Sequence, residues 1–391
     1  MVNEYFQFID YGGTFFYYLF ELANFSFLAF LALYLYKIQL ININSLIAWL
    51  LIFFSPLVLN YFLISPYLFG DQFLYSGETF LLKSNGESYF QQPHVDLTGK
   101  ILGLAPLPNF MTVTSLAFSN KLFLFLSFLW FKRYFNNENQ VLLFFLIPSI
   151  VLYSSLALRD SLIMIFSILF LISLLKNRYL LSIIFLYPIF ILKIQMFVFL
   201  SLYFIGRTIF RAHQSFALMA LFGLFILIIG FAFEDQVLTL INIYRWGFAA
   251  ENFSVGNGYS SYAAWSLYGQ EVKDSLEIFS IEGAILKSLI KLPIFLLLPM
   301  PWNWSNPFQV MQTIESIFLI CVFAYITFKD QAYRNNELIL LLFILLLSSM
   351  LYSVIMANEG TFVRYRFTLF YPFLLAAFFI TKNKKGYFKK H

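Results

Sequence analysis

Long apolar runs separated by short polar segments dominate the sequence. A membrane-spanning helix needs about 20 consecutive, mostly apolar residues, and runs of this kind recur along the whole chain. On this criterion we expect about nine full spans, at 15–36, 46–64, 111–131, 141–157, 161–175, 214–233, 308–328, 337–356 and 367–381. The pattern predicts an all-α fold, in which residues 1–391 form a single integral-membrane domain built as a polytopic bundle of transmembrane helices.

Two further apolar stretches do not fit a full span. Residues 179–206 are interrupted by Lys193 and are too short for two crossings of the membrane. For this stretch we expect a pair of short helices that rise into the membrane and turn back. Residues 283–299 carry Lys287 and Lys291 four positions apart, on one face of a helix. That spacing favours an interfacial or re-entrant helix.

Basic residues follow many of the apolar runs, and this bias predicts the orientation of the chain. Cytoplasmic loops of membrane proteins carry an excess of Lys and Arg. The basic residues that we expect on the cytoplasmic side are Lys37, Lys132, Arg133, Lys176, Arg178, Arg207, Arg211, Lys329, Arg334 and the lysines of 382–390. The N-terminus is then outside and the C-terminus is cytoplasmic. Residues 65–108 and 234–306 become large external loops that are expected to carry much of the active site.

The composition supports a membrane protein and narrows its chemistry. The chain is 61% hydrophobic and only 12% charged, whereas soluble domains contain roughly a quarter charged residues. The net charge of +5 follows from the cytoplasmic loops, so we expect no nucleic-acid partner. The single cysteine, Cys321, excludes an internal disulfide. Because no zinc-protease, phosphate-loop or dinucleotide motif is present, we expect no metal and no cofactor.

Charged residues at the expected external face are the first candidates for a site. Arg159 and Asp160 occupy a turn between two apolar runs. Asp160 either caps the following helix or takes part in catalysis, whereas a cation beside a helix N-terminus is ill-placed and indicates an anion partner for Arg159. Lys193 lies in an apolar run with Gln195 beside it. A charge at membrane depth is costly and usually functional, unless Lys193 extends to the external surface.

Two arginines precede the last apolar run, in the segment that contains Arg364 and Arg366. If this segment is extended, both guanidinium groups point to one side. Two planar forks on one side suit a phosphate or diphosphate. The alternative is that Glu359 neutralises one arginine and that lipid headgroups bind the other.

The two expected external loops contain further candidates. Arg245, Glu251 and Tyr259 lie in a segment rich in aromatic, Asn and Ser residues, which is a composition that suits sugar rings and hydroxyls. Asp71 follows the second span directly and is therefore expected at the membrane edge. A carboxylate there could act as general base on a hydroxyl. The catalytic acid or base is left open among Asp71, Asp160 and Glu251.

The sequence resembles the Wzy-type polymerases of O-antigen, capsule and exopolysaccharide, which share a general plan with integral-membrane glycosyltransferases of the GT-C class. The residues that carry the resemblance are Leu158-Arg159-Asp160, Leu192-Lys193-Ile194-Gln195, Pro299-Met300-Pro301-Trp302 with Glu315 downstream, and Arg364-Tyr365-Arg366. Asp71 matches by position the first-loop acid of the wider glycosyltransferase class. The resemblance implies transfer of a growing glycan from undecaprenyl diphosphate onto a new lipid-linked repeat unit, at the periplasmic face of a bacterial inner membrane.

This resemblance also implies partners and leaves alternatives open. The implied partners are an undecaprenyl-diphosphate-linked oligosaccharide, membrane lipid and a chain-length regulator. A GT-C transferase that uses a polyprenyl-phosphate sugar is a second hypothesis. A transporter or flippase for lipid-linked sugars is a third, although such proteins often contain inverted repeats and we find none in this sequence. An O-antigen ligase is a fourth, and it would be expected to rely on an external histidine, for which only His94 qualifies.

Overall fold

The computed structural model describes residues 15–63, 71–86, 92–108, 112–135, 138–213, 223–225, 228, 231–257, 278–304, 307–329, 335–355 and 359–387. Within these ranges every regular element is a helix, which confirms the predicted all-α fold for the described part of the chain. The chain forms two compact units, Met1–Phe197 and Val198–His391, and each is described by itself. The single domain that we expected from the sequence stays a prediction.

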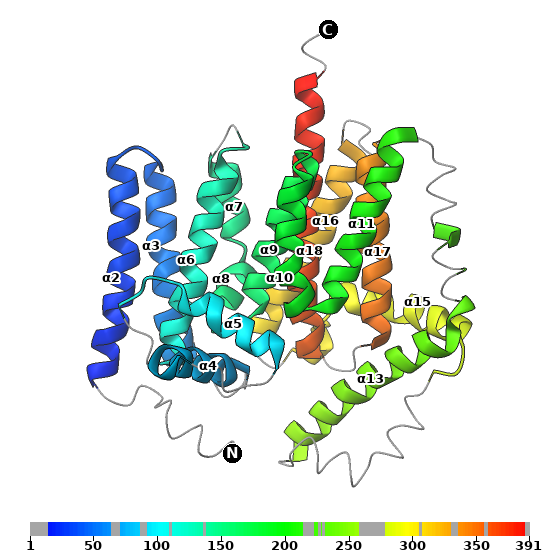
Figure 1. Cartoon of the computed structure of the whole chain (residues 1–391), viewed down its shortest axis with the longest axis horizontal. Helices are drawn as coiled ribbons and strands as arrows, with labels where there is room; N and C mark the ends of the chain where they lie inside the picture. The colour runs from blue at the N-terminus through cyan, green and yellow to red at the C-terminus, as the bar shows by residue number, and fades with distance from the viewer. Residues whose placement is uncertain are drawn as a thin grey trace. The chain divides into compact units, whose positions relative to one another are not determined.

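The first unit is a bundle of upright helices with two helices lying across one end of it (Figure 1). The upright helices are α2 (Phe15–Lys37), α3 (Ile43–Val58) with its π-helical extension η1 (Leu59–Leu63), α6 (Val113–Lys132), α7 (Glu138–Phe145), α8 (Pro148–Ser154), α9 (Asp160–Leu175) and α10 (Tyr179–Leu192). Helices α4 (Asp71–Asn85) and α5 (Pro93–Gly103) pack against each other and against α6, at the end of the bundle where α6 begins. The first expected external loop is therefore largely helical.

Aromatic rings fill the centre of this unit. The ring of Trp49 on α3 lies 4.8 Å from that of Phe125 and 5.3 Å from that of Phe128, measured between centroids. Phe145, the last residue of α7, lies 5.8 Å from Trp49, and all four side chains are buried. Tilted and edge-to-face contacts of this kind are favourable arrangements for aromatic rings. They join α3, α6 and α7 into one core.

The second unit combines upright helices with two oblique ones (Figure 1). Its helices are α11 (Ile194–His213, which begins in the first unit), α13 (Glu234–Asn257), α15 (Ile281–Leu297), the short η3 (Pro301–Asn303), α16 (Pro307–Phe328), α17 (Asn336–Ile355) and α18 (Glu359–Tyr387). Helices α13 and α15 run obliquely and pack against α17. A cluster of buried apolar residues joins these three helices, with Ile241, Ala284 and Val354 among its members.

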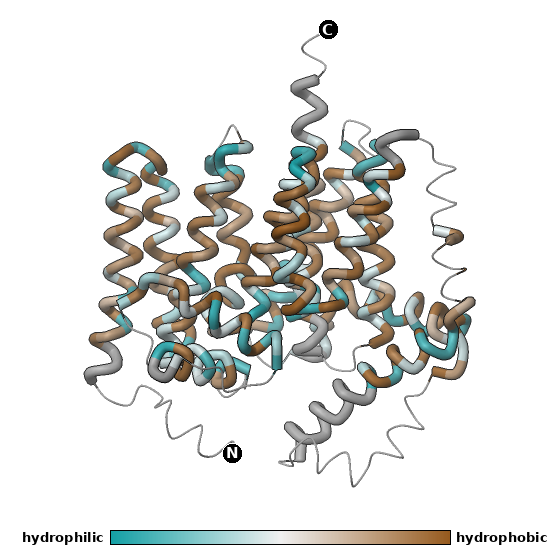
Figure 2. The backbone as a smooth tube through the Cα atoms, in the orientation of Figure 1, coloured by the Kyte–Doolittle hydropathy of each residue, from teal (hydrophilic) through white to brown (hydrophobic). Residues whose placement is uncertain are grey.

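Six helices in the described part of the chain are long and apolar enough to cross a membrane. They cover Leu19–Lys37, Ile43–Leu63, Val113–Lys132, Pro307–Phe328, Asn336–Ile355 and Val363–Thr381. Hydrophobic residues line the upright helices, whereas hydrophilic residues gather at helix ends and in α4 and α5 (Figure 2). These helices identify the protein as a polytopic membrane protein, as the sequence predicted.

The predicted number of full spans is not confirmed, for reasons visible in individual segments. The expected span 141–157 is wrong, because α7 ends at Phe145 and α8 starts at Pro148. Proline lacks the backbone N–H that continues a helix and is favoured at a helix start. The expected span 161–175 is a shorter apolar helix, Asp160–Leu175. The expected span 214–233 lies mostly outside the described residues.

The two irregular apolar stretches are helical, as predicted. Residues 179–206 are divided between α10 and α11. The division falls at Lys193, whose backbone is extended with φ −161° and ψ 92°. The stretch 283–299 largely coincides with α15. Whether either pair of helix ends returns to the same membrane face stays a prediction.

Candidate functional site

The turn between α8 and α9 leads to Arg159, and a buried amide on α6 holds it. The Nδ2 atom of Asn120 donates to the carbonyl oxygens of Leu156 and Leu158, at 2.7 and 3.0 Å. Asn120 is fully buried. Buried carbonyl groups need a donor in place of water, and this side chain supplies two at once. The backbone immediately before Arg159 is therefore fixed to the core of the bundle.

Two further amide side chains bind the same turn from other helices. The Oε1 atom of Gln72 on α4 accepts a hydrogen bond from the backbone N–H of Ala157, at 2.9 Å. The Nδ2 atom of Asn60, in η1, donates to the carbonyl oxygen of Ser155, at 2.8 Å. Both side chains are buried. Because they come from separate elements, the position of the turn depends on α4 and η1 as well as on α6.

A buried lysine holds the end of α8. The Nζ atom of Lys121 donates to the carbonyl oxygen of Val151 at 2.9 Å and contacts Oγ of Ser154 at 2.8 Å. These residues form the last turn of α8, where carbonyl groups lack helical partners and carry partial negative charge. Lys121 is fully buried, so it acts within the fold and not at the surface. Its charge within an apolar run was a signal that sequence reasoning missed.

His94 lies near the start of α5. Two charged residues at the starts of other helices, Asp71 and Arg159, affect its pKa. Burial lowers the pKa of His94 first; the charge of Arg159 lowers it further, whereas the charge of Asp71 raises it. Asp71 is the first residue of α4 and Arg159 occupies the N-cap position of α9. Three segments far apart in the sequence thus bring an acid, an imidazole and a guanidinium into one electrostatic neighbourhood. His94 was considered from sequence only under the ligase hypothesis.

Close packing of α4 on α5 fixes the relative position of Asp71 and His94. A Cβ atom at Gly99 would lie 2.8 Å from Cγ of Glu78, which is closer than packed side chains allow. The Oγ1 atom of Thr79 donates to the carbonyl oxygen of Gly99 at 3.2 Å. Glycine is therefore required at position 99 for the two helices to approach.

Asp160 is placed as the first residue of α9 and is 2% exposed. It is not the N-cap residue, because Arg159 holds that position and makes no side-chain cap bond. A carboxylate in the first turn is favoured by the helix dipole. The Oγ atom of Ser161 donates back to the carbonyl oxygen of Tyr153 at 3.0 Å. The burial of Asp160 indicates that it stabilises the start of α9; its predicted catalytic role stays a prediction.

A second acidic group, Glu21 on α2, is buried in the same unit. Its two carboxylate oxygens accept hydrogen bonds from the hydroxyls of Tyr61 and Thr112. Thr112 also caps α6 by accepting from the backbone N–H of Ser115, at 3.0 Å. Glu21 is fully buried. Its position within an apolar run was the signal that sequence reasoning missed.

Two predicted cations of the second unit, Arg245 and Arg366, bond backbone carbonyl oxygens within the fold. Arg366 is 4% exposed. Its Nη1 atom donates to the carbonyl oxygen of Leu296 at 2.7 Å, and Nη2 donates to that of Leu298 at 2.6 Å. The guanidinium therefore caps the C-terminal end of α15. Arg245 is 5% exposed and donates from Nη1 to the carbonyl oxygen of Val354.

Arg364 does not form the expected pair with Arg366. Helix α18 already begins at Glu359, so the segment is not extended. Residues two apart on a helix point to nearly opposite sides, which separates the two guanidinium groups. Arg364 is half-buried. The conditional prediction of two forks on one side of an extended strand is therefore wrong in its geometry.

The remaining predicted residues are placed as follows. Lys193 is 6% exposed at the break between α10 and α11, and Gln195 is half-buried in the first turn of α11. Glu251 belongs to α13, but its side chain lies outside the described residues. Tyr259 lies entirely outside the described residues.

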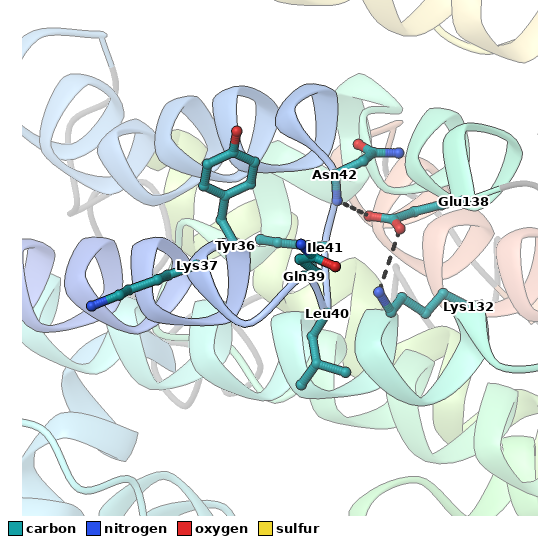
Figure 3. Close-up of a pocket in the computed structure, with 8 residues that line it drawn as sticks. All are labelled: Tyr36, Lys37, Gln39, Leu40, Ile41, Asn42, Lys132 and Glu138. Carbon is teal, nitrogen blue, oxygen red and sulfur yellow. Dashed lines mark hydrogen bonds and ion pairs between the residues drawn. The ribbon is translucent and has the colours of Figure 1, made fainter.

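A cleft of about 500 Å³ opens at the opposite end of the first unit, at the turn between α2 and α3 (Figure 3). Its lining residues are Tyr36, Lys37, Gln39, Leu40, Ile41, Asn42, Lys132 and Glu138. Glu138 accepts from the backbone N–H of Asn42 at 3.1 Å and lies 3.4 Å from Nζ of Lys132. Because these charges neutralise each other, the cleft offers less for catalysis than the Asp71, His94 and Arg159 group.

Within the ranges that the structure describes, no three His, Cys, Asp or Glu side chains are placed to hold a metal ion. The fold and its apolar helices define the class, which is a polytopic α-helical membrane protein. No protein family, curated protein or solved structure matches the chain.

Proposed function

We propose that this protein is an integral-membrane glycosyltransferase whose donor is a sugar carried on a membrane lipid diphosphate. The observation that carries the proposal is the meeting of three segments in the first unit. Gln72, the neighbour of Asp71, bonds the N–H of Ala157 two residues before Arg159 at 2.9 Å, and α5, which contains His94, packs on α4. An acid or imidazole can accept a proton, and a guanidinium can bind a phosphate. Both are needed to transfer a glycan from a lipid diphosphate to a hydroxyl group.

The position of these residues suits a lipid-linked donor. Asp71 and His94 belong to helices that lie across the end of the bundle, beside the ends of long apolar helices. A diphosphate attached to a lipid tail resides at that depth of the membrane. Arg159 is held there by the bonds of Asn120, Gln72 and Asn60 to the turn that precedes it. Such preorganisation strengthens electrostatic stabilisation, because the charge need not be moved during the reaction.

In the proposed reaction the acceptor hydroxyl oxygen attacks the anomeric carbon of the donor sugar. The bond between that carbon and the diphosphate oxygen breaks, and the lipid diphosphate leaves with the bonding electrons. Arg159 stabilises the negative charge that develops on this leaving group. Asp71 accepts the hydroxyl proton, either directly or through His94. The lowered pKa of His94 keeps its imidazole neutral near neutral pH, as a proton acceptor requires.

The particular reaction that we propose is polymerisation of glycan repeat units on undecaprenyl diphosphate, at the periplasmic face of a bacterial inner membrane. Support comes from the distribution of charge in the first unit. Lys37 and Lys132 end α2 and α6, at the end of the bundle opposite to α4 and α5. If these lysines are cytoplasmic, the Asp71, His94 and Arg159 group faces outside, where such repeat units are joined. A chain-length regulator is the proposed protein partner.

Transfer of a finished glycan to a different acceptor, as in an O-antigen ligase, is a second candidate. The observation that favours it is His94, because the ligase hypothesis requires an external histidine and the structure brings His94 into the group with Asp71 and Arg159. The two candidates differ in the acceptor. A polymerase extends lipid-linked repeat units when no other acceptor is present. A ligase does not.

The test uses the purified full chain in liposomes with undecaprenyl-diphosphate-linked repeat units as the only glycan, followed by gel separation of products. We expect a ladder of product lengths from the wild type. For Asp71→Asn we expect a rate that is lower by a factor of at least about 100, since loss of a general base typically costs at least that factor. Asp96→Asn is the matched control, because Asp96 pairs with Lys100 on α5. Equal rates in wild type and Asp71→Asn would contradict the proposal.

A further inference from the structure

Hydrogen bonds join helix α13 of the second unit to the segment that begins α15. These bonds precede the basic residues of α15 in the sequence. The side chain of Asn242 donates to the carbonyl oxygen of Ile278 and accepts from its N–H, both at 3.0 Å. Oε1 of Glu234 accepts from the N–H of Ile281, the first residue of α15, at 3.0 Å. Because Asn242 bonds both the N–H and the carbonyl group of Ile278, and Glu234 bonds the N–H of Ile281, the start of α15 is held in a defined position on α13.

Helix α15 has an exposed apolar face and a basic inner flank. Leu286, Leu289 and Ile290 are 61%, 53% and 63% exposed. Large apolar side chains exposed along one face of a helix in a membrane protein suit contact with lipid. Lys287 and Lys291, one helical turn apart, are both half-buried on the other side, next to the residues that pack against the second unit's core. Their ammonium groups therefore lie beside a lipid-facing surface, but not on it.

Arg245 on α13 adds a third cation to these two lysines. Arg245 is 5% exposed and is anchored by its bond to the carbonyl oxygen of Val354. The pKa of Lys291 is lowered by burial, and also by the positive charges of Arg245 and Lys287. Ser353, the neighbour of Val354, donates from Oγ to the carbonyl oxygen of Ser288 at 3.2 Å. This contact brings Arg245 to the turn of α15 that contains both lysines. We call Arg245, Lys287 and Lys291 the basic cluster.

The two lysines of the basic cluster differ from Lys100 and Arg207, which form ion pairs. Lys100 pairs with Asp96 at 2.7 Å, and Arg207 pairs with Glu337 at 2.7 Å. Within the described ranges neither Lys287 nor Lys291 forms an ion pair with a carboxylate. Partly buried charges of one sign are unfavourable unless a charge of opposite sign offsets them. An anion between α13 and α15 would relieve this repulsion.

We infer that the basic cluster binds the phosphate group of an anionic membrane lipid, whose acyl chains lie along the exposed apolar face of α15. A phosphate accepts hydrogen bonds from several ammonium and guanidinium donors at once. The apolar surface formed by Leu286, Leu289 and Ile290 explains why the anion comes from a lipid. This inference concerns binding by the second unit and does not depend on the glycosyl transfer proposed for the first unit.

The test measures retention of phosphatidylglycerol and phosphatidylcholine by the purified full chain in detergent, using native mass spectrometry. We expect the wild type to retain phosphatidylglycerol in preference. The double variant Lys287→Gln with Lys291→Gln should bind phosphatidylglycerol at least about tenfold more weakly, since each lysine near an anionic membrane surface contributes measurably to binding. The double variant Lys287→Arg with Lys291→Arg should retain the preference.

Lys329→Gln is the matched control, because Lys329 belongs to the same unit but lies over the ring of Tyr325; it should behave as wild type. Thermal unfolding of each variant in detergent reports whether the fold is kept. Equal affinity of wild type and the Gln double variant for phosphatidylglycerol would overturn the inference. Displacement of the lipid by inorganic pyrophosphate at equal concentration would assign the cluster to a free anion and overturn the lipid source.

Discussion

The side-chain amide of Asn120 donates a 3.0 Å hydrogen bond to the carbonyl oxygen of Leu158, the residue immediately before Arg159. A second bond from the same nitrogen reaches Leu156. This buried side chain on α6 therefore helps to position the backbone that leads to Arg159, together with Gln72 and Asn60. The proposed anion-binding role of Arg159 therefore depends on a residue that contacts no substrate.

Replacing Asn120 tests this dependence. In Asn120→Ala the carbonyl groups of Leu156 and Leu158 lose a buried donor, which should cost about 1–3 kcal/mol of stability. Transfer activity should fall further than stability alone explains, because Arg159 is displaced. Thermal unfolding in detergent and product ladders measure the two effects. Asn139→Ala is the control, since Asn139 is exposed and accepts a hydrogen bond from the side chain of Asn42 at 3.2 Å, away from the turn before Arg159; a loss of equal size there would contradict the prediction.

Arg366 is expected to matter for folding more than for chemistry. Its guanidinium donates to the carbonyl groups of Leu296 and Leu298 at the end of α15. In Arg366→Ala these carbonyls lose charge-assisted bonds, and stability should drop by at least about 1.5–3 kcal/mol. Unfolding temperature measures the loss. Arg178→Ala, which removes an exposed arginine, should leave that temperature nearly unchanged; a stable Arg366→Ala protein that has lost activity would instead favour a substrate role.

The pH dependence of transfer should report on His94. Its pKa is lowered from 6.5 by burial and by the charge of Arg159, and is raised by the charge of Asp71. If neutral His94 relays the proton, the rate stays constant down to about pH 6.5 and falls only at lower pH. Arg159→Gln removes a positive neighbour, so the acid limb of the remaining activity should move to higher pH. Asp71→Asn should move it to lower pH. Unchanged limbs in both variants would exclude His94 from the titration.

Binding of anionic lipid should weaken as the pH rises, and at a lower pH than the usual lysine pKa of 10.5 would set. The pKa of Lys291 is lowered by burial, Arg245 and Lys287, so its ammonium loses its proton below the usual value of 10.5. A neutral amine no longer attracts phosphate. Phosphatidylglycerol retention measured against pH should decline in this range for the wild type. Lys291→Arg should abolish the early decline, because arginine remains charged; an unaltered profile would contradict the assignment of Lys291.

The all-α membrane fold could be predicted from sequence because hydrophobic length is a local property. The break at Lys193 was also predictable, since a charged residue interrupts an apolar run. The expected span 141–157 failed because Pro148 starts a new helix inside an otherwise apolar segment. Arg364 and Arg366 failed as a pair because the helix begins earlier than the charged residues indicated.

The candidate site was predictable only in part. Asp71 and Arg159 were identified from their places beside apolar runs. His94 was not joined to them, because α4 and α5 were expected as loop, and their packing through Gly99 and Glu78 is a tertiary contact that leaves no local pattern. Likewise, the partners of Glu21 come from two distant helices, which a single sequence does not reveal.

The central claim, polymerisation of lipid-linked repeat units at a site that contains Arg159, is tested most directly by deleting the gene in its native bacterium and analysing surface glycan by gel electrophoresis. The strain is complemented with wild type or with Arg159→Ala, and membrane levels of both proteins are compared. We predict single repeat units in the deletion strain, long chains with the wild type, and single units with Arg159→Ala at normal protein level. Long chains of normal length distribution in the deletion strain would contradict the claim.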